Sequence, residues 1–106
     1  MFFKRVEAVN ISTEQLREKV RAKDDFYLLD VRTQAENVSQ AIPGSHHIPL
    51  QELGSRVWEI PKDKEIVVYC RIGNRSAYAS DYLAREGYHA KNLTGGIQAW
   101  NKDVNI

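Results

Sequence analysis

The 106-residue sequence contains a single cysteine, Cys70. One cysteine excludes an intrachain disulfide, a Cys-x-x-Cys redox pair and a cysteine-based zinc site, and it fits a reducing, cytoplasmic compartment. The three histidines, His46, His47 and His89, have no standard metal-binding spacing, because adjacent residues of a strand point to opposite faces. No metal site is therefore expected.

The sequence also lacks a charge excess and any long apolar run. Fifteen Lys and Arg residues against fourteen Asp and Glu leave a net charge of +1, which predicts neither a nucleic-acid surface nor a polybasic membrane patch. No stretch has the length of a transmembrane helix, and Met1-Phe2-Phe3 is too short for a signal-peptide core. Without repeats or linkers, residues 1–106 are predicted to form one domain.

Short apolar runs alternate with helical patterns along the chain. We expect a short element at Val6, Ala8 and Val9, strands over residues 26–31, 46–48, 65–69 and 90–93, and helices over residues 13–22, 33–40, 50–57, 76–86 and from the Gly95-Gly96 turn through Trp100. Trp58 is expected to pack beside the third helix. This alternation predicts an α/β fold with a parallel sheet and helices on both faces.

The carboxyl ends of two predicted strands carry the polar candidates for a site. Ligands of parallel α/β sheets bind beyond these strand ends. Asp30 ends the 26–31 strand and Cys70 directly follows the 65–69 strand. Asp30 is expected to tie the cysteine loop down, and Arg32 to pair with Glu36, so both are interpreted as loop-supporting rather than catalytic residues.

Cys70 begins a short cationic loop with the sequence Cys70-Arg71-Ile72-Gly73-Asn74-Arg75-Ser76. Converging backbone amides, a helix start and the charges of Arg71 and Arg75 are each expected to lower the thiol pKa. Arg75 is expected to point inward toward a bound anion. Gly73 permits the turn, and Ser76 is the predicted N-cap, with a hydroxyl that can also donate to a thiolate. The loop thus predicts a reactive thiolate rather than an inert buried cysteine.

Four short motifs, in this order, resemble the signatures of single-domain rhodaneses: Asp30-Val31-Arg32, Ile42-Pro43-Gly44-Ser45, the loop from Cys70 to Ser76, and Leu93-Thr94-Gly95-Gly96-Ile97-Gln98-Ala99-Trp100. The resemblance spans nearly the whole chain. It implies the rhodanese-like fold, with a central sheet of about five strands. The sequence departs from the family at Asn37, where many relatives have an aromatic residue, and at Gln40-Ala41, where they have Gly-His.

The resemblance further implies a sulfurtransferase that carries sulfur as a cysteine persulfide. Cys70 would take a sulfane sulfur from thiosulfate or a related donor and pass it to cyanide, a small thiol or a protein cysteine. The substrate-binding residues would be Arg71, Ile72, Gly73, Asn74, Arg75 and Ser76. No metal or organic cofactor is required by this chemistry. Because no second cysteine can resolve the persulfide, the sulfur must leave to another molecule.

Two alternatives remain open at this stage. Cysteine-dependent phosphatases and arsenate reductases use a similar loop, but they need an arginine six positions after the cysteine, where this sequence has Ser76 and places Arg75 one position earlier. Rhodanese-like domains also occur as non-catalytic binding modules or as sulfur-delivery partners. Inert copies often lose the cysteine, whereas Cys70 and both loop arginines are present.

Overall fold

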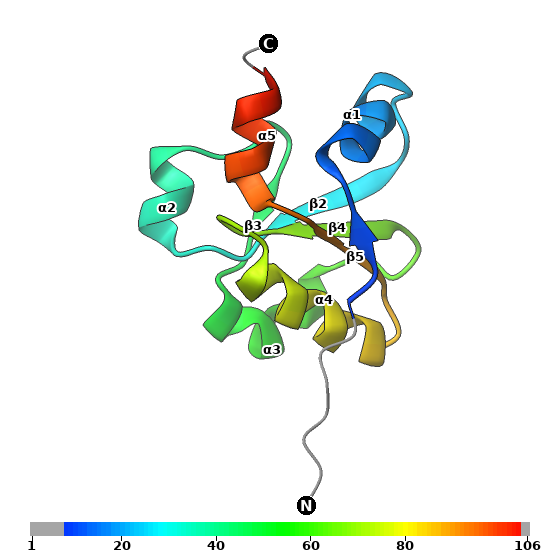
Figure 1. Cartoon of the computed structure of the whole chain (residues 1–106). Coiled ribbons are helices and arrows are strands. Elements are labelled where there is room, and N and C mark those ends of the chain that lie inside the picture. Colours follow the sequence, from blue (N-terminus) through cyan, green and yellow to red (C-terminus); the bar gives the residue numbers. More distant parts are fainter. Residues whose placement is uncertain (1–7, 105–106) are drawn as a thin grey trace, which may run out of the picture.

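The computed structural model describes residues 8–104, and within this range five strands form one parallel sheet in the order β1-β5-β4-β2-β3. The elements in chain order are β1 (Asn10–Ile11), α1 (Thr13–Arg21), β2 (Phe26–Asp30), α2 (Gln34–Ser39), β3 (His46–His47), η1 (Leu50–Glu52), α3 (Leu53–Arg56), η2 (Val57–Glu59), β4 (Glu65–Tyr69), α4 (Asn74–Arg85), β5 (His89–Leu93) and α5 (Gly96–Val104). Figure 1 shows this arrangement. The predicted α/β fold, with a five-stranded parallel sheet, is confirmed.

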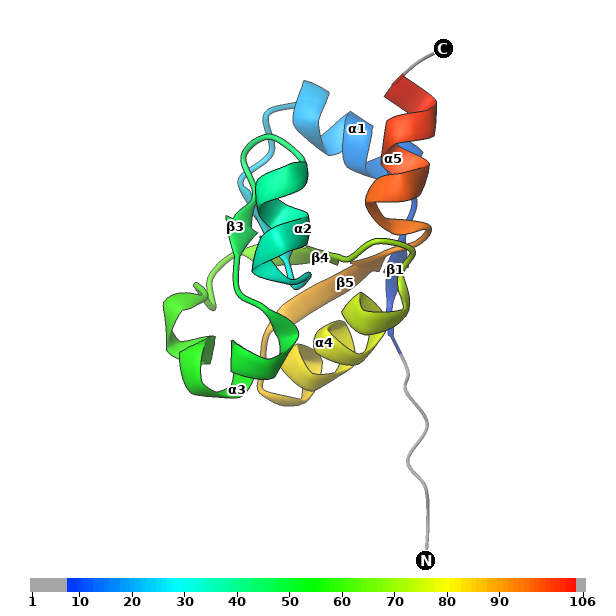
Figure 2. The same ribbon diagram turned by 90° about the vertical axis from the view of Figure 1, so that its left-hand side faces the viewer.

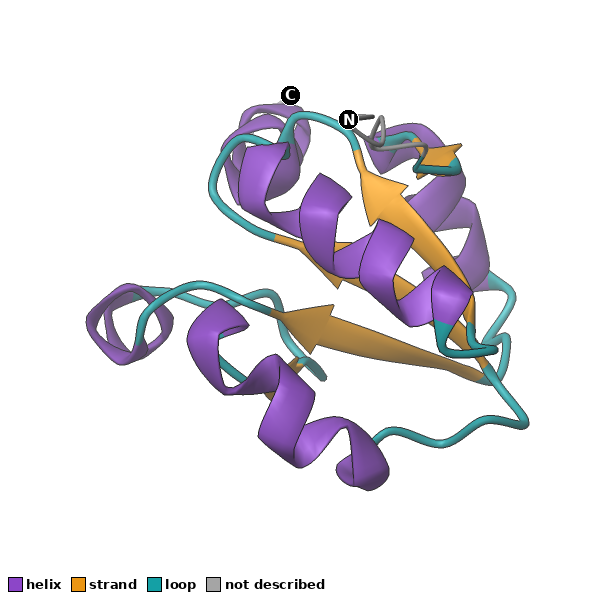
Figure 3. Ribbon diagram, turned by 90° about the horizontal axis from the view of Figure 1, so that it is seen from below, coloured by secondary structure: helices purple, strands orange, loops and turns teal. Residues whose placement is uncertain are grey.

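Helices cover both faces of the sheet, as Figures 1 and 2 show. Helices α1 and α5 lie on one face, and α3 and α4 lie on the other. Successive residues of the central strand β4 serve opposite cores, because side chains alternate along a strand. Val67 and Tyr69 pack with Leu16 of α1, whereas Val68 packs with Leu83 of α4. In Figure 3, α4 lies against β5. Because α4 follows β4 in the chain, the start of this helix lies beside the carboxyl ends of the central strands.

The first strand differs from the expectation. Val6 lies outside the described residues, and Ala8 and Val9 precede the strand, which begins at Asn10. Pairing with β5 explains this position, because Ile11 aligns with Leu93 and is buried in the core of the α1 and α5 face. The expected short element therefore lies too early in the chain.

The segment after β3 also differs from the expectation. The predicted helix over residues 50–57 is a short α-helix, α3, flanked by the two 3-10 turns η1 and η2. In the second turn Val57 packs against the core, and the adjacent Trp58 points to solvent with 77% of its surface exposed. Trp58 therefore does not pack beside this helix. None of the helices in the described part of the chain has the length and apolar character that a membrane crossing requires.

Candidate active site

Cys70 follows the last residue of β4 and is only 1% exposed. Its Sγ atom accepts hydrogen bonds from the Gly73 amide at 3.1 Å and from the Ser76 amide at 3.4 Å. The Ser76 hydroxyl oxygen lies 3.2 Å from the same sulfur. The loop therefore curls around Sγ and directs three polar groups toward it.

These donors set the direction in which the pKa of the Cys70 thiol is shifted. Burial alone, the largest single influence, raises the pKa of Cys70. The Ser76 hydroxyl and the amides of Ser76, Gly73 and Ile72 act in the opposite direction and bring the pKa below its ordinary value. The largest lowering contributions thus come from hydroxyl and amide dipoles, whereas the sequence analysis also gave weight to the charges of the two arginines.

Helix α4 begins at Asn74, two residues earlier than predicted, and its N-cap is Gly73 rather than Ser76. Gly73 has a φ of 111°, a left-handed conformation that favours glycine and turns the chain directly into the helix. Since Gly73 has no capping side chain, the amide of Ser76 in the first helical turn donates to the Cys70 sulfur instead. The sulfur thus takes the position of a capping acceptor.

Helix α5 holds the backbone of the cysteine loop through hydrogen bonds. The amides of Ile97 and Gln98 donate to the carbonyl oxygens of Cys70 at 2.9 Å and Arg71 at 3.1 Å. A Cβ atom on Gly96 would lie 2.4 Å from the Arg71 oxygen and 2.5 Å from the Cys70 oxygen. The last sequence motif therefore forms a close backbone contact with the cysteine loop.

Asp30 is fully buried at the end of β2, the strand beside β4. Its carboxylate accepts hydrogen bonds from the Arg32 amide at 2.9 Å, from Arg32 Nε at 3.0 Å, from Arg32 Nη2 at 2.8 Å and from Asn37 Nδ2 at 3.0 Å. The expectation that Asp30 ties down the cysteine loop is wrong, because its hydrogen bonds go to Arg32 and Asn37. The expected pairing of Arg32 with Glu36 is wrong for the same reason.

Glu36 instead pairs with Arg75 from the start of α4. Two hydrogen bonds of 2.7 and 2.9 Å join the guanidinium to the carboxylate. The Arg75 bonds hold the pKa of Glu36 down at about 2, with a smaller lowering contribution from its capping partner Thr33. Arg75 thus bridges α4 to α2 rather than pointing inward over the sulfur.

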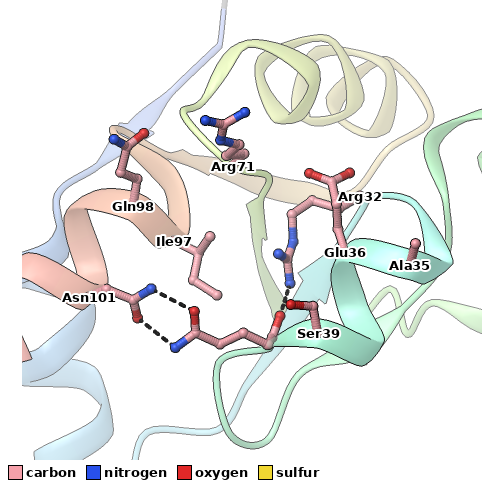
Figure 4. A pocket seen from close by; sticks show the side chains of 9 residues that line it. Arg32, Ala35, Glu36, Ser39, Arg71, Ile97, Gln98 and Asn101 are labelled. Carbon is pink, nitrogen blue, oxygen red and sulfur yellow. Dashed lines mark hydrogen bonds between the residues drawn. The ribbon is translucent and has the colours of Figure 1, made fainter.

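The remaining loop side chains lie at the surface. Arg71, Ile72 and Asn74 are exposed. Arg71 lines a groove of about 600 Å³ together with residues of α2 and α5, which Figure 4 shows. Within residues 8–104, Arg71 has no ion-pair partner, in contrast to Arg32 and Arg75. The structure thus leaves one unpaired guanidinium beside the cysteine loop.

The family-atypical positions have polar partners near this groove. Asn37 binds Asp30, as described above. The backbone carbonyl of Gln40 accepts a hydrogen bond from Arg32, and its side-chain amide exchanges hydrogen bonds of 2.9 and 3.5 Å with Asn101 of α5. Both Gln40 and Asn101 line the groove, and Figure 4 shows Asn101 at its edge. Of these positions, Gln40 therefore contributes to the lining of the groove, and Asn37 contributes to the support of Asp30.

Sequence reasoning missed Asn92 on β5. Asn92 is 5% exposed, and its Oδ1 lies 2.5 Å from the Ser76 hydroxyl. The available signal was a polar residue two positions after Ala90 and therefore on the same face of β5. That face packs against α4.

Comparisons with known proteins agree with the architecture and with the sequence motifs. The profile of the rhodanese-like domain matches residues 12–103. A sulfurtransferase from Allochromatium vinosum is 42% identical over 91 residues, which cover 85% of each chain. Among solved structures, a rhodanese-like domain protein from Staphylococcus aureus has a TM-score of 0.83 and 30% identity, with 87% of this chain and 90% of that chain covered.

A rhodanese-related protein from Thermoplasma volcanium has the same TM-score of 0.83 at 34% identity, with 90% of this chain and 92% of that chain covered. The family profile covers most of the chain, and these relatives are aligned over most of their own length. The chain therefore belongs to the rhodanese-like sulfurtransferase family.

Proposed function

We propose that the protein transfers a sulfane sulfur from thiosulfate or a related donor to cyanide or a thiol acceptor through a persulfide on Cys70. The Cys70 thiolate attacks the outer sulfur of thiosulfate, and the sulfur–sulfur bond of the donor breaks with its electron pair leaving on sulfite. The acceptor then attacks the outer persulfide sulfur, which restores the thiolate. Cyanide would leave as thiocyanate, so no external oxidant or reductant is needed.

The observation that carries this proposal is the ring of hydrogen-bond donors around Sγ. The Gly73 amide, the Ser76 amide and the Ser76 hydroxyl all lie within 3.4 Å of the sulfur. The two backbone amides are fixed in this way and stabilise negative charge on the attacking thiolate and on the persulfide that replaces it, and the Ser76 hydroxyl adds to this when its proton faces the sulfur. A reducing compartment such as the cytoplasm would keep Cys70 available as a thiol.

The unpaired Arg71 supports a role in attracting an anionic donor. Arg32 and Arg75 are already neutralised by carboxylates, so Arg71 offers the accessible positive charge beside Cys70. The adjoining groove of about 600 Å³ falls within the usual range of about 300–1,000 Å³ for small-molecule sites. That volume suits an acceptor larger than cyanide, such as a small thiol or a segment of an acceptor protein.

Intact-protein mass spectrometry tests the proposal. Incubation with thiosulfate should add one sulfur atom, and subsequent cyanide should remove it as thiocyanate. Cys70→Ser is the matched control and should abolish both changes, because it replaces only the sulfur that attacks. A wild-type protein that gains no sulfur from any sulfane donor would refute the proposal in favour of a non-catalytic module, and turnover of phosphate esters or arsenate would favour the phosphatase alternative.

A further inference from the structure

A row of three polar side chains leads from the Cys70 sulfur to the edge strand β1. Ser76 Oγ lies 3.2 Å from Cys70 Sγ and 2.5 Å from Asn92 Oδ1. Asn92 Nδ2 donates in turn to Asn10 Oδ1 at 3.3 Å. Ser76 and Asn92 are buried, whereas Asn10 is exposed. The row therefore connects a buried sulfur to an amide at the surface.

The single hydroxyl proton of Ser76 cannot serve both of its neighbours at once. When the hydroxyl donates to Asn92 Oδ1, its contact with Cys70 is a hydrogen bond only if the thiol donates to Ser76 Oγ. This arrangement favours the neutral thiol. A thiolate requires the hydroxyl proton to face the sulfur, and Ser76 Oγ then needs a donor where Asn92 Oδ1 lies.

A carboxamide meets both demands, because its two ends have similar shape and opposite polarity. Turning the Asn92 amide by half a rotation brings Nδ2 to Ser76 and frees the hydroxyl to donate to the thiolate. Asn92 Oδ1 then faces Asn10, whose exposed side chain can turn to offer its own amide hydrogen. Every buried polar group keeps a partner, so the exchange avoids the cost of an unsatisfied group.

We propose that Asn92 is a positioning residue whose carboxamide turns with the charge on Cys70. When the sulfur is a thiolate, the turned amide lets the Ser76 hydroxyl proton point to the sulfur. When the thiol is neutral, the hydroxyl proton points to Asn92. The inference rests on the proposed role of Cys70 as the sulfur carrier. The backbone around Asn92 is fixed by strand pairing, since its amide donates to the Val9 carbonyl at 2.7 Å. Only the side chain therefore has to move.

Charged groups also surround the cysteine loop. Arg71 belongs to the loop, Arg75 to α4, Asp30 and Arg32 to the end of β2, and Glu36 to α2. On β5 itself, Lys91 lies on the opposite face from Asn92 and pairs with Glu65. These charges are the same in all variants compared below, so their effects on the thiol pKa cancel.

The pH dependence of Cys70 alkylation by iodoacetamide tests the coupling in the full chain. Asn92→Asp keeps the shape, and its ionised carboxylate can only accept a hydrogen bond from Ser76, which holds the hydroxyl proton away from the sulfur. We expect the thiol pKa to rise and alkylation below it to slow by about tenfold, corresponding to about 1.4 kcal/mol. In a Ser76→Ala background the same substitution should slow alkylation much less. Equal slowing in both backgrounds would mean that the new carboxylate acts by charge alone and would overturn the proposal.

Nuclear magnetic resonance tests the same inference in the wild-type protein, with Cys70→Ala as the control. The side-chain amide resonances of Asn92 should titrate with the midpoint measured for the Cys70 thiol, and they should not titrate in Cys70→Ala. Flat resonances in the wild type would refute the coupling. Neither measurement uses a sulfur donor, so a protein that shows the coupling but gains no sulfur would refute the proposed function while supporting the role of Asn92.

Discussion

Asp30 and Cys70 end neighbouring parallel strands and are equally buried, yet they have different kinds of partner. The Asp30 carboxylate is bonded to the full positive charge of Arg32. The Cys70 sulfur accepts bonds from neutral amides and lies beside a neutral hydroxyl. A buried carboxylate needs a counter-charge, because the removal of a charge from water is otherwise too costly. Under the proposed function the Cys70 sulfur gains and loses charge during the reaction. Neutral dipoles can stabilise such a charge without forming an ion pair that must be broken.

The Asp30 side of this comparison gives the largest expected effect. Arg32→Met leaves a buried carboxylate without its counter-charge and should lower the free energy of unfolding by about 3–5 kcal/mol. Urea denaturation followed by circular dichroism measures it. Adding Asp30→Asn to the same chain should recover much of the loss, because the unpaired charge is gone. A loss below about 1 kcal/mol in Arg32→Met would contradict the buried ion pair.

A substitution at Gly96 should disrupt the close contact between helix α5 and the Cys70 loop. Gly96→Ala and the control Gly44→Ala both force alanine into a left-handed conformation, at a cost of about 1–2 kcal/mol each. Only at Gly96 would the added carbon meet the loop carbonyls, whereas a Cβ atom on Gly44 would have no neighbour within 4 Å. We expect thermal denaturation to show an extra loss of about 1–3 kcal/mol for Gly96→Ala. Equal losses would mean that the close contact relaxes without cost.

Two variants compare how strongly a neutral hydrogen-bond donor and a full positive charge lower the pKa of Cys70. Ser76→Ala removes a hydroxyl donor, and hydrogen bonds to charged groups contribute about 1.5 kcal/mol or more. We expect the thiol pKa to rise and alkylation below it to slow by about tenfold. Arg75→Ala should slow it less, because that guanidinium is bonded to Glu36 and partly exposed. A larger effect from Arg75→Ala would reverse the assignment to dipoles.

The Glu36–Arg75 pair should give the smallest effect, and one that depends on pH. The pKa of Glu36 in the folded protein, about 2, lies below its ordinary value of about 4.3 in an unfolded chain. The pair therefore stabilises the fold fully above about pH 4.3, and this stabilisation is lost as the pH falls through about 2. Glu36→Gln should cost about 0.5–1 kcal/mol at neutral pH, because solvent screens this half-exposed pair. Urea titrations at several pH values should show the difference vanishing in acid, and a difference that persists there would contradict the ion pair.

Local pattern was enough to predict strand β4 and the cysteine loop, whereas the first strand lies later in the chain than the pattern indicated. The apolar run before Cys70 fixed the strand, and the glycine and cationic residues after it marked the turn, because both signals are contained in adjacent residues. The partners of Arg32 and Glu36 could not be predicted in this way. Glu36 lies four residues after Arg32 in the sequence, but it pairs with Arg75 at the start of α4, and Arg32 pairs with Asp30.

The start of α4 and the role of Asn92 required the three-dimensional structure for a related reason. Ser76 has the residue type of an N-cap, but the Cys70 sulfur accepts the first-turn amide and lets the helix begin at Asn74. The pattern marks Asn92 only as an unexpected polar residue. The role of Asn92 depends on its contact with Ser76, which lies 16 residues earlier in the chain and is brought to it by the packing of α4 on β5.

The peptide group between Arg71 and Ile72 is held at both of its ends. Its amide faces the Cys70 sulfur, and its carbonyl oxygen accepts a hydrogen bond from Gln98 of α5. A dipole held in this way is already oriented before charge appears on the sulfur. Under the proposed function, the site would therefore need little reorganisation when a thiolate or persulfide forms. In the proposed reaction, helix α5 would thus hold the Arg71–Ile72 peptide dipole in its orientation toward the sulfur through the hydrogen bond from Gln98.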